Sequence, residues 1–537
     1  MTVVVDRPAR PKAPGPSPSP ARRLWDAPVW AHLLALTAVL LVLLPVIGTS
    51  SSFLADEGAA IIQAHSLSAG RGWVVEHPAP ELDPTGHNYP ITHAESGLKG
   101  QAPLGKHPVY PVLLAVADRL GGVTGMVLLS IFGTVAAAGL GAALAGRLGT
   151  NLSRLTVWVI GLASPLFFDS FLVIGHTIGA ALATGAVLFA LIAIERRNVS
   201  AALAVAPFVA GAVLFRNEAI IFAVALAVVA GVFALRTRPR WPAVIVAIGA
   251  LGATGAARVG EKVWIAGFVG RSTRAAALPV PVATDNLAKG RVDGFLLTWF
   301  TPSYWGSPVL VLSLLAMVAA IAVGAVLVRR APQRRGDILA AAAVAAGASI
   351  VAFLADASNV VPGLLVAFPL AAAGLFALRL DIFRAPGTFL AGGVFALFAG
   401  GVIATQYSIG GSGEWGGRYF ALGIPVLVPV LILALRRAGR VLDAPTVRWA
   451  VAALAVCSVA MSAMAVMSLR SSHESKIRLV AKIERAAAGT GAARPVIVTT
   501  SDAMPRVAWP TFDGNRWLVT TLSDLPSLRE RLARAGV

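Results

Sequence analysis

Apolar runs of about 20 residues recur along most of the chain, and each is long enough to cross a bilayer as an α-helix. Of the 537 residues, 57% are hydrophobic and only 13% are charged, and the mean hydropathy is +0.76. Soluble chains carry about 25% charged residues, so this composition is not that of a soluble protein. The sequence therefore predicts an all-α polytopic membrane protein.

The apolar runs define about thirteen predicted transmembrane helices. They lie at 31–47, 124–145, 155–168, 173–194, 200–215, 219–235, 242–257, 308–328, 338–354, 360–378, 387–405, 419–435 and 449–467. Residues 1–29 are rich in Pro, Ser and basic side chains and are predicted to form a disordered cytoplasmic tail. The transmembrane domain follows at 30–468, and a small extracytoplasmic α/β domain is predicted at 469–537.

The arginines predict the orientation. They recur in alternate connections, for example Arg196 and Arg197, or Arg436 and Arg437, whereas the short turns at 169–172 and 356–359 hold no Lys or Arg. The positive-inside rule then places the N-terminus in the cytoplasm, and an odd number of spans places the C-terminus outside. These loops account for the net charge of +19, so we expect membrane lipids and no nucleic acid as partners. The one cysteine, Cys457, excludes a disulfide framework.

Three predicted outer segments are long. The first outer loop, 51–122, is polar and ends in a predicted interfacial helix at 108–120 that is too short to span comfortably. The second, 258–307, is basic and aromatic. The third is the tail, where 495–500 reads as a strand and 525–535 as an amphipathic helix.

Asp56 and Glu57 directly follow the first predicted span. Carboxylates at a bilayer surface are costly to keep and are commonly functional. At this place they could act as a general base on the head group of a lipid-linked substrate. The alternative is that the pair caps a helix that begins near Gly58.

Two further positions could hold a phosphate at head-group depth. Lys106 is the last cation before the predicted interfacial helix, and Arg418 begins a span after a glycine-rich turn between Trp415 and Tyr419. A guanidinium can donate to phosphate in a bidentate fork. Both cations have an alternative role as snorkelling anchors, and the two aromatic residues an alternative role in an interfacial belt.

Polar groups also interrupt the apolar runs elsewhere. Arg216 and Glu218 separate two predicted spans, so that Arg216 either binds phosphate or pairs with Glu218. His176 lies near the start of another span, where it is either a substrate contact or a packed, hydrogen-bonded residue. The first outer loop also gathers histidines and acids that match no compact metal motif, namely His65, His77, His87, His93, His107, Glu76, Asp83 and Glu95. We therefore assign no metal ligand and expect no required cofactor, with a divalent metal left open.

The order of these motifs resembles that of the GT-C superfamily of membrane glycosyltransferases, especially the branch with protein mannosyltransferases and the lipid A aminoarabinose transferase. Members have an acidic residue or pair after the first span, a large first outer loop and a Lys-Pro-Pro-like element. The resemblance covers about 30–467. Its motifs are Asp56-Glu57, Lys106-His107-Pro108, His176-Thr177, Arg216-Asn217-Glu218 and Trp415-Gly416-Gly417-Arg418-Tyr419.

This resemblance implies an inverting hexosyl- or pentosyltransferase that moves a sugar from a polyprenyl-phosphate carrier to a glycan, lipid or protein hydroxyl. The reaction would take place on the outer face of the cytoplasmic membrane. Asp56, with Glu57, would serve as the base. The leaving phosphate would be stabilised by Lys106, Arg216, Arg418 and Tyr419, with His176, Glu218 and Trp415 as further substrate contacts. By analogy alone, decaprenyl-phosphate mannose or arabinose would be natural donors.

The main alternative is a multi-span transporter or lipid flippase. Transporters commonly show repeats and broken helices near the middle of the membrane. This sequence has no evident repeat and concentrates its polar residues at the predicted outer surface. The pattern therefore favours the enzyme.

Overall fold

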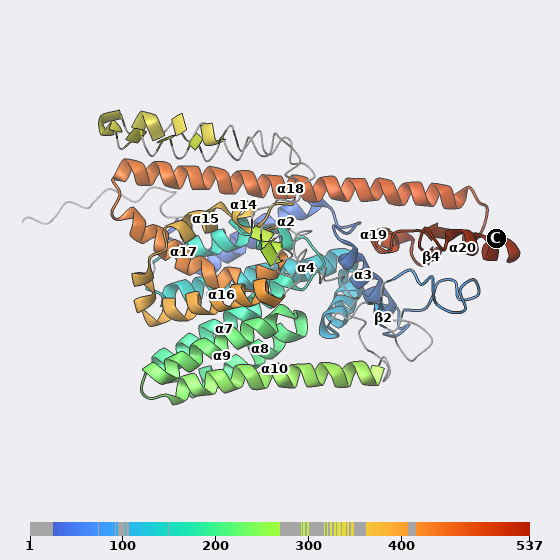
Figure 1. Ribbon diagram of the computed structural model, residues 1–537, viewed down its shortest axis with the longest axis horizontal. Helices are drawn as coiled ribbons and strands as arrows, with labels where there is room; N and C mark the ends of the chain where they lie inside the picture. Colours follow the sequence, from blue (N-terminus) through green and yellow to red (C-terminus); the bar gives the residue numbers. More distant parts are fainter. Residues whose placement is uncertain are drawn as a thin grey trace, which may run out of the picture.

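The computed structural model describes residues 25–73, 75–91, 93–94, 102–103, 107–149, 151–268, scattered positions between 291 and 349, 361–405 and 415–537. Its helices lie side by side in one bundle, and the elements outside the bundle gather at one end (Figure 1). Within these described ranges, seven helices are long and apolar enough to cross a membrane. The protein is therefore a mostly helical membrane protein, as the composition predicts.

The first spans follow the prediction closely. Helix α2 covers Val29–Ile47 and α4 covers Val109–Arg147. Helix α4 is two helices joined at Gly121 and Gly122, where the backbone leaves helical geometry and Gly122 has φ +59°. Only glycine adopts that conformation freely, so the joint separates a short helix from the span proper. The predicted helix at 108–120 and the predicted span at 124–145 are both present.

The predicted span at 155–168 is broken. It consists of α5 at Ser153–Trp158, a π-helical turn η1 at Val159–Ala163, and α6 at Leu166–Asp169. Pro165 begins the last piece and cannot donate a backbone hydrogen bond to the preceding turn. The predicted span at 360–378 is likewise broken into α14 at Leu364–Ala367 and α15 at Pro369–Phe376. Both predictions of a continuous helix were wrong.

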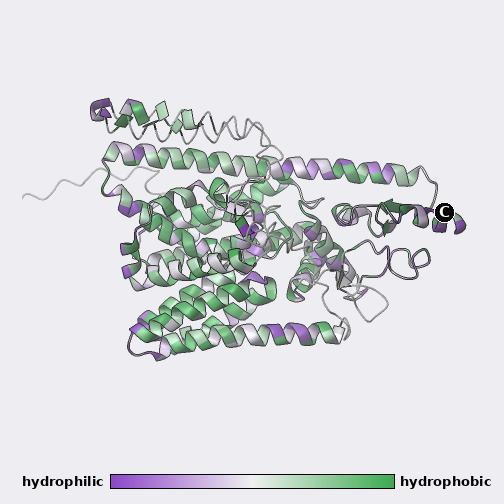
Figure 2. Ribbon diagram, in the orientation of Figure 1, coloured by the Kyte–Doolittle hydropathy of each residue, from purple (hydrophilic) through white to green (hydrophobic). Residues whose placement is uncertain are grey.

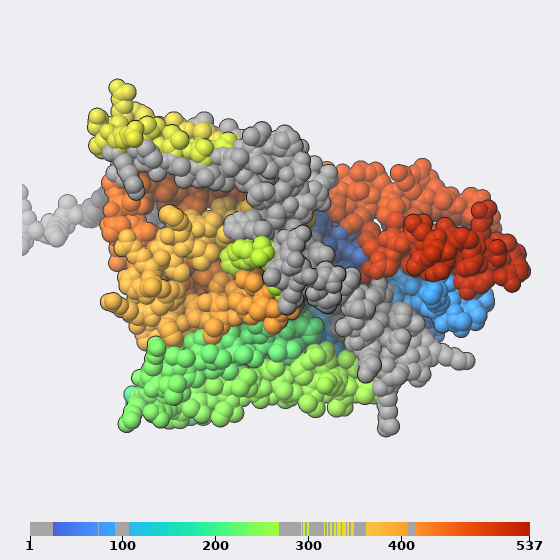
Figure 3. Space-filling view, in the orientation of Figure 1, coloured from blue at the N-terminus to red at the C-terminus, as the bar shows by residue number. Residues whose placement is uncertain are grey.

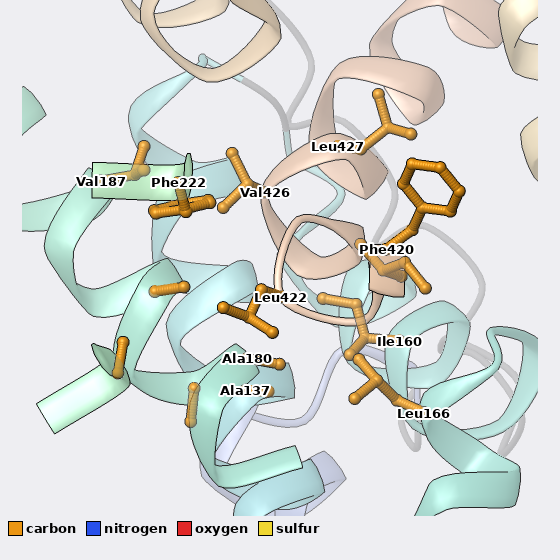
Figure 4. Close-up of a cluster of buried hydrophobic side chains, with 14 of the residues drawn as sticks. Ala137, Ile160, Leu166, Ala180, Val187, Phe222, Phe420, Leu422, Val426 and Leu427 are labelled. Carbon is orange, nitrogen blue, oxygen red and sulfur yellow. The ribbon is translucent and has the colours of Figure 1, made fainter. Parts of the chain in front are cut away.

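The remaining helices of the bundle pack through small residues. They are α7 at His176–Arg196, α8 at Val199–Phe215, α9 at Glu218–Arg236, α10 at Trp241–Phe268, α16 at Pro386–Thr405 and α17 at Ile424–Gly439. Short 3₁₀ turns are η4 at Pro332–Arg334, η5 at Leu380–Arg384 and η6 at Arg418–Phe420. Figure 4 shows Ala137 and Ala180 beside Leu422 in the buried core, where small side chains let the helices approach closely.

Two helices reach beyond the membrane. The 28 residues of α10 span about 42 Å, against a hydrocarbon core of about 30 Å. Helix α10 continues to Phe268, beyond the predicted end of this span at residue 257, and the outer segment at 258–307 stays a prediction. Helix α18, Ala444–Ala488, has 45 residues and spans about 68 Å. Its far half is more polar and projects from the bundle (Figure 2).

The tail after α18 contains the predicted strand and helix. Strand β3 at Val496–Thr499 pairs in parallel with β4 at Arg516–Val519, and Val496 lies opposite Arg516. Helix α19 at Met504–Val507 and the 3₁₀ turn η7 at Trp509–Thr511 connect the strands, and α20 at Leu525–Arg534 follows them. The first outer loop contributes α3 at Ala55–Ser68 and a short antiparallel pair, β1 at His93–Ala94 with β2 at Ala102–Pro103.

The tail and the first outer loop share one hydrophobic core. Trp517 and Phe512 of the tail pack with Ile62 and Tyr89 of the loop. Burial raises the pKa of Tyr89 well above its ordinary value, so the phenol stays neutral and donates to a backbone carbonyl 2.9 Å away. Asn88 exchanges hydrogen bonds of 2.9 Å with the backbone of Val519. The tail therefore lies against the loop and α18, on the same side of the bundle (Figure 3).

Candidate functional site

Helix α18 holds the segment that leads to Asp56. Ser51 Oγ lies 2.7 Å from Nδ1 of His473. Lys476 donates to the carbonyl oxygen of Phe53, and its Nζ atom lies 5.2 Å from the centre of the Phe53 ring. The projecting half of α18 thus fixes the chain between the first span and α3.

Glu57 anchors the start of α3. Its Oε1 accepts from the backbone N–H of Leu54 at 2.7 Å, and its Oε2 accepts from that of Val173 at 2.8 Å. The side chain is 2% exposed. The first bond closes the first helical turn, and the second ties α3 to the segment before α7. This geometry favours the capping role for Glu57, and its catalytic role stays a prediction.

Asp56 instead faces two arginines. Its Oδ2 lies 3.5 Å from Nη2 of Arg418, and its Oδ1 lies 3.8 Å from Nη1 of Arg506. The Asp56 side chain is 27% exposed, so a solvent-borne group can reach it. Each oxygen of the carboxylate thus faces a cation, and an ionised carboxylate is the form that can accept a proton.

Arg418 depends on two glycines for its position. Gly416 and Gly417 have φ of +68° and +72°, in the left-handed region that favours glycine. A Cβ on Gly416 would overlap Pro165, with its Cβ only 2.5 Å away. The described part of the predicted glycine-rich turn therefore packs directly against Pro165, which lies between η1 and α6. This packing places Arg418 beside the carboxylate of Asp56.

The aromatic residues of this turn are buried. Trp415 stacks on Phe168, with ring centres 5.0 Å apart and an interplanar angle of 8°. The guanidinium of Arg418 lies 5.2 Å from the centre of the Tyr419 ring, a cation–π arrangement. Trp415 is 3% exposed and Tyr419 is 4% exposed. Their packing fixes the turn, while their predicted substrate contacts stay predictions.

Arg216 and Glu218 form the ion pair that the sequence left as one alternative. Nε and Nη2 of Arg216 donate to the two Glu218 oxygens at 3.0 and 2.8 Å, a bidentate arrangement. Both side chains are largely buried. Arg418 also interacts electrostatically with Glu218, so the pair belongs to the same charged cluster as Asp56.

The structure separates His176 from solvent. It is fully buried, and its Nδ1 lies 3.4 Å from Oδ2 of Asp169, which is itself 1% exposed. This is the packed arrangement that the sequence left as an alternative to a substrate contact. Lys106 lies outside the described residues. Its neighbour His107 is buried and lies 2.9 Å from Oε1 of Glu261 in α10.

Four histidines of the first outer loop have described side chains, and each of them pairs with a carboxylate. His65 lies 3.4 Å from Asp118, His77 lies 3.0 Å from Asp83 and His87 lies 3.7 Å from Asp524. Among the described residues, no group of three or more His, Cys, Asp or Glu side chains could hold a metal ion.

Two cations at the site have no signal in the sequence. Arg506 comes from the tail and Lys476 from the projecting half of α18, both of which are polar segments. A charge is conspicuous where it interrupts an apolar run, as Arg216 and Arg418 do. In a polar segment it is ordinary, so only the fold could identify these two.

The fold is similar to that of solved membrane proteins. The structure of ArnT from Cupriavidus metallidurans bound to undecaprenyl phosphate matches with a TM-score of 0.50 and 14% identity, over 93% of this chain and 87% of that one. The apo state of ArnT gives a TM-score of 0.48 and 14% identity, over 91% and 85%. The archaeal oligosaccharyltransferase AglB from Archaeoglobus fulgidus, in complex with an inhibitory peptide and a dolichol-phosphate, gives 0.49 and 13%, over 91% and 64%.

No protein-family model matches the sequence, and no curated protein does. The likeness to ArnT is one of fold, since the identity is only 14%. It agrees with the resemblance drawn from the order of the motifs, and it shows that the chain has a fold like that of ArnT.

Proposed function

We propose that this protein is an inverting glycosyltransferase that moves a sugar from a polyprenyl-phosphate carrier to an acceptor hydroxyl. One observation carries the proposal: the partly exposed carboxylate of Asp56 lies beside Arg418 at one end of the bundle. This places a candidate base next to a candidate phosphate ligand. That ArnT, which has the same fold, was solved with undecaprenyl phosphate supports the choice of carrier.

The residues suit the chemistry of such a transfer. The acceptor oxygen attacks the anomeric carbon from the face opposite the phosphate, and Asp56 takes the hydroxyl proton. The bond between that carbon and the phosphate oxygen breaks, and its electron pair leaves with the polyprenyl phosphate. Arg418 is placed to meet this growing negative charge, which a fixed cation stabilises.

The charges support an outward-facing site. Arg147, Arg436, Arg437 and Arg440 line one cavity at the opposite end of the bundle from Asp56. The positive-inside rule assigns that end to the cytoplasm. We therefore propose that the reaction takes place on the outer face of the cytoplasmic membrane. The N-terminus is then cytoplasmic and the tail extracytoplasmic.

The first test is binding of polyprenyl phosphate to the purified protein in nanodiscs. We expect the wild type to bind and Arg418→Ala to bind far more weakly, with Arg418→Lys intermediate because it cannot form the bidentate fork. Arg437→Ala, at the basic end, is the control and should bind normally. A wild type that does not bind the carrier would refute the proposal and favour the transporter reading.

The second test is transfer from decaprenyl-phosphate mannose and arabinose, with cell membranes as the source of acceptors. Asp56→Asn keeps the shape of the side chain but removes the base, which should slow transfer by about 10²–10⁴-fold. Carrier binding should persist in this variant, since Arg418 remains. Transfer at the wild-type rate would show that Asp56 is not the base.

A further inference from the structure

Arg506 reaches the candidate site from the far end of the chain. It lies in α19 of the tail, is 7% exposed, and its Nη1 is 3.8 Å from Oδ1 of Asp56. We infer that Arg506 is a positioning residue for the transfer reaction, which keeps Asp56 oriented and charged while Arg418 binds the carrier phosphate. This inference rests on the proposed function and adds the tail to the catalytic unit.

The tail holds Arg506 rigidly. Its Nε donates to the carbonyl oxygen of Asp502 and its Nη2 to Oδ2 of the same residue, both at 3.0 Å. The backbone of Arg506 in turn rests on Gly58, two residues after Asp56. A Cβ on Gly58 would overlap the carbonyl oxygen of Arg506 and lie 2.6 Å from its carbonyl carbon. The guanidinium is therefore set against the first turn of α3 and has little freedom to move.

Arg418 and Arg506 face different oxygens of the Asp56 carboxylate. Arg418 faces Oδ2 at 3.5 Å and Arg506 faces Oδ1 at 3.8 Å. Charge-assisted hydrogen bonds to carboxylates are about 2.7–2.9 Å long, so neither arginine occupies its oxygen tightly. The carboxylate is thus oriented by two loose charge contacts rather than by close hydrogen bonds.

The two arginines are not equivalent. The Arg418 side chain is 21% exposed, whereas that of Arg506 is 9% exposed and bound to Asp502. When a phosphate binds Arg418, Asp56 loses part of one counter-charge. Arg506 cannot follow the phosphate without breaking its bonds to Asp502. It therefore remains as the fixed counter-charge of the base.

The test compares Arg506→Gln and Arg506→Lys with Arg71→Gln in the full-length protein. Arg71 is a fitting control because it also joins loop to tail, 2.9 Å from Asp513, but in an exposed ion pair away from Asp56. We expect Arg506→Gln to lower kcat by about 10–100-fold, the size of effect that a small misplacement of a catalytic group produces. Carrier affinity and the protease resistance of the tail should stay as in the wild type. Arg506→Lys should recover part of kcat, and Arg71→Gln should behave as the wild type.

Three results would overturn the inference. An unchanged kcat would show that Asp56 needs no help from Arg506. A loss of carrier affinity equal to that of Arg418→Ala would make Arg506 a phosphate ligand. A loss of kcat accompanied by proteolysis of the tail would reduce Arg506 to a docking contact.

A second measurement needs no substrate and so does not depend on the proposed function. Thermal unfolding of Asp56→Asn, Arg506→Gln and the double variant forms a double-mutant cycle. We expect the double variant to melt closer to the wild type than the sum of the single shifts. Additive shifts in the unfolding temperature would mean that the two side chains do not interact, and this result would refute the inference. A wild type that binds no carrier would instead refute the proposed function.

Discussion

Gly58→Ala tests how closely the tail fits the start of α3. The added Cβ would overlap the carbonyl oxygen of Arg506 and lie 2.6 Å from its carbonyl carbon. Nonbonded carbon atoms prefer about 3.5–4.0 Å, so the Arg506 backbone would have to retreat by about 1 Å. Helix α19 sits between β3 and β4, whose core holds Phe512 and Trp517, so it cannot swing away freely.

Two effects on stability oppose each other in this variant. Replacing glycine by alanine inside a helix is worth about 1 kcal/mol of stability. Overpacking a fitted contact costs about 1–3 kcal/mol. The net change is thus a loss of about 0–2 kcal/mol, too small to unfold the protein. The displacement of Arg506 is the sharper consequence, because a shift of 1 Å at a catalytic constellation can cost on the order of 10²-fold in rate.

The assay is sugar transfer measured beside thermal unfolding, with Gly255→Ala as the matched control. Gly255 lies in α10, where an added Cβ would meet nothing within 4 Å. We expect Gly58→Ala to transfer about 10–100-fold more slowly, and Gly255→Ala to transfer normally. If Gly58→Ala were more stable than the wild type and fully active, the fit of the tail against α3 would not be as described.

Three further predictions concern the parts that hold the site. Trp517→Ala should reduce the free energy of tail docking by about 3–5 kcal/mol and make the tail protease-sensitive, because Trp517 is fully buried in the shared core. Leu522→Ala is the control, because residue 522 is 77% exposed, and it should change neither docking nor protease resistance. Gly416→Ala should weaken carrier binding, since it strains a left-handed turn and crowds Pro165, and the binding assay above measures it. Glu57→Gln should lower the unfolding temperature, because an amide nitrogen would face a backbone N–H at a cost of about 1–3 kcal/mol; an unchanged melting curve would contradict the capping role.

Hydropathy predicted most spans because crossing the hydrocarbon requires a long apolar helix. The spans predicted at 31–47, 200–215 and 387–405 match α2, α8 and α16 to within a few residues. The two broken spans are as apolar as the others, so an average over their residues does not register the π-helical turn or Pro165. The predicted spans at 308–328 and 338–354 fall where only scattered positions are described, so they stay predictions.

Helix ends outside the membrane were harder to predict. The charges of Arg258 and Glu261 mark where α10 leaves the hydrocarbon, but a helix that continues into solvent keeps its backbone bonds and needs no apolar face there. The same holds for α18 after Met467. Hydropathy therefore did not locate the helix end.

The sequence located charged residues but not their partners. Asp56 stood out because it follows the first predicted span, and Arg216 and Arg418 because they lie between apolar runs. Nothing in the sequence, however, says which helix ends meet. The pairing of Arg216 with Glu218, two residues further on, was already one alternative from the sequence. The structure also joins Asp56 to Arg418, and Oε2 of Glu57 to the backbone of Val173, which the sequence did not indicate. Such pairings arise from packing between elements far apart in the chain.

The contacts and the exposure of each arginine indicate which of them can bind a phosphate most readily. Arg216 makes two bonds of 2.8–3.0 Å to Glu218, and its side chain is 12% exposed. Freeing it would leave a buried carboxylate unpaired, and breaking such a pair costs about 3–5 kcal/mol. Arg506 is held by Asp502 of the tail, through one bond to its backbone carbonyl and one to its Oδ2. The Arg418 side chain is the most exposed of the three, at 21%, so a phosphate can reach it most readily. Arg216 then acts best in place, through its charge, while Arg418 makes the contact.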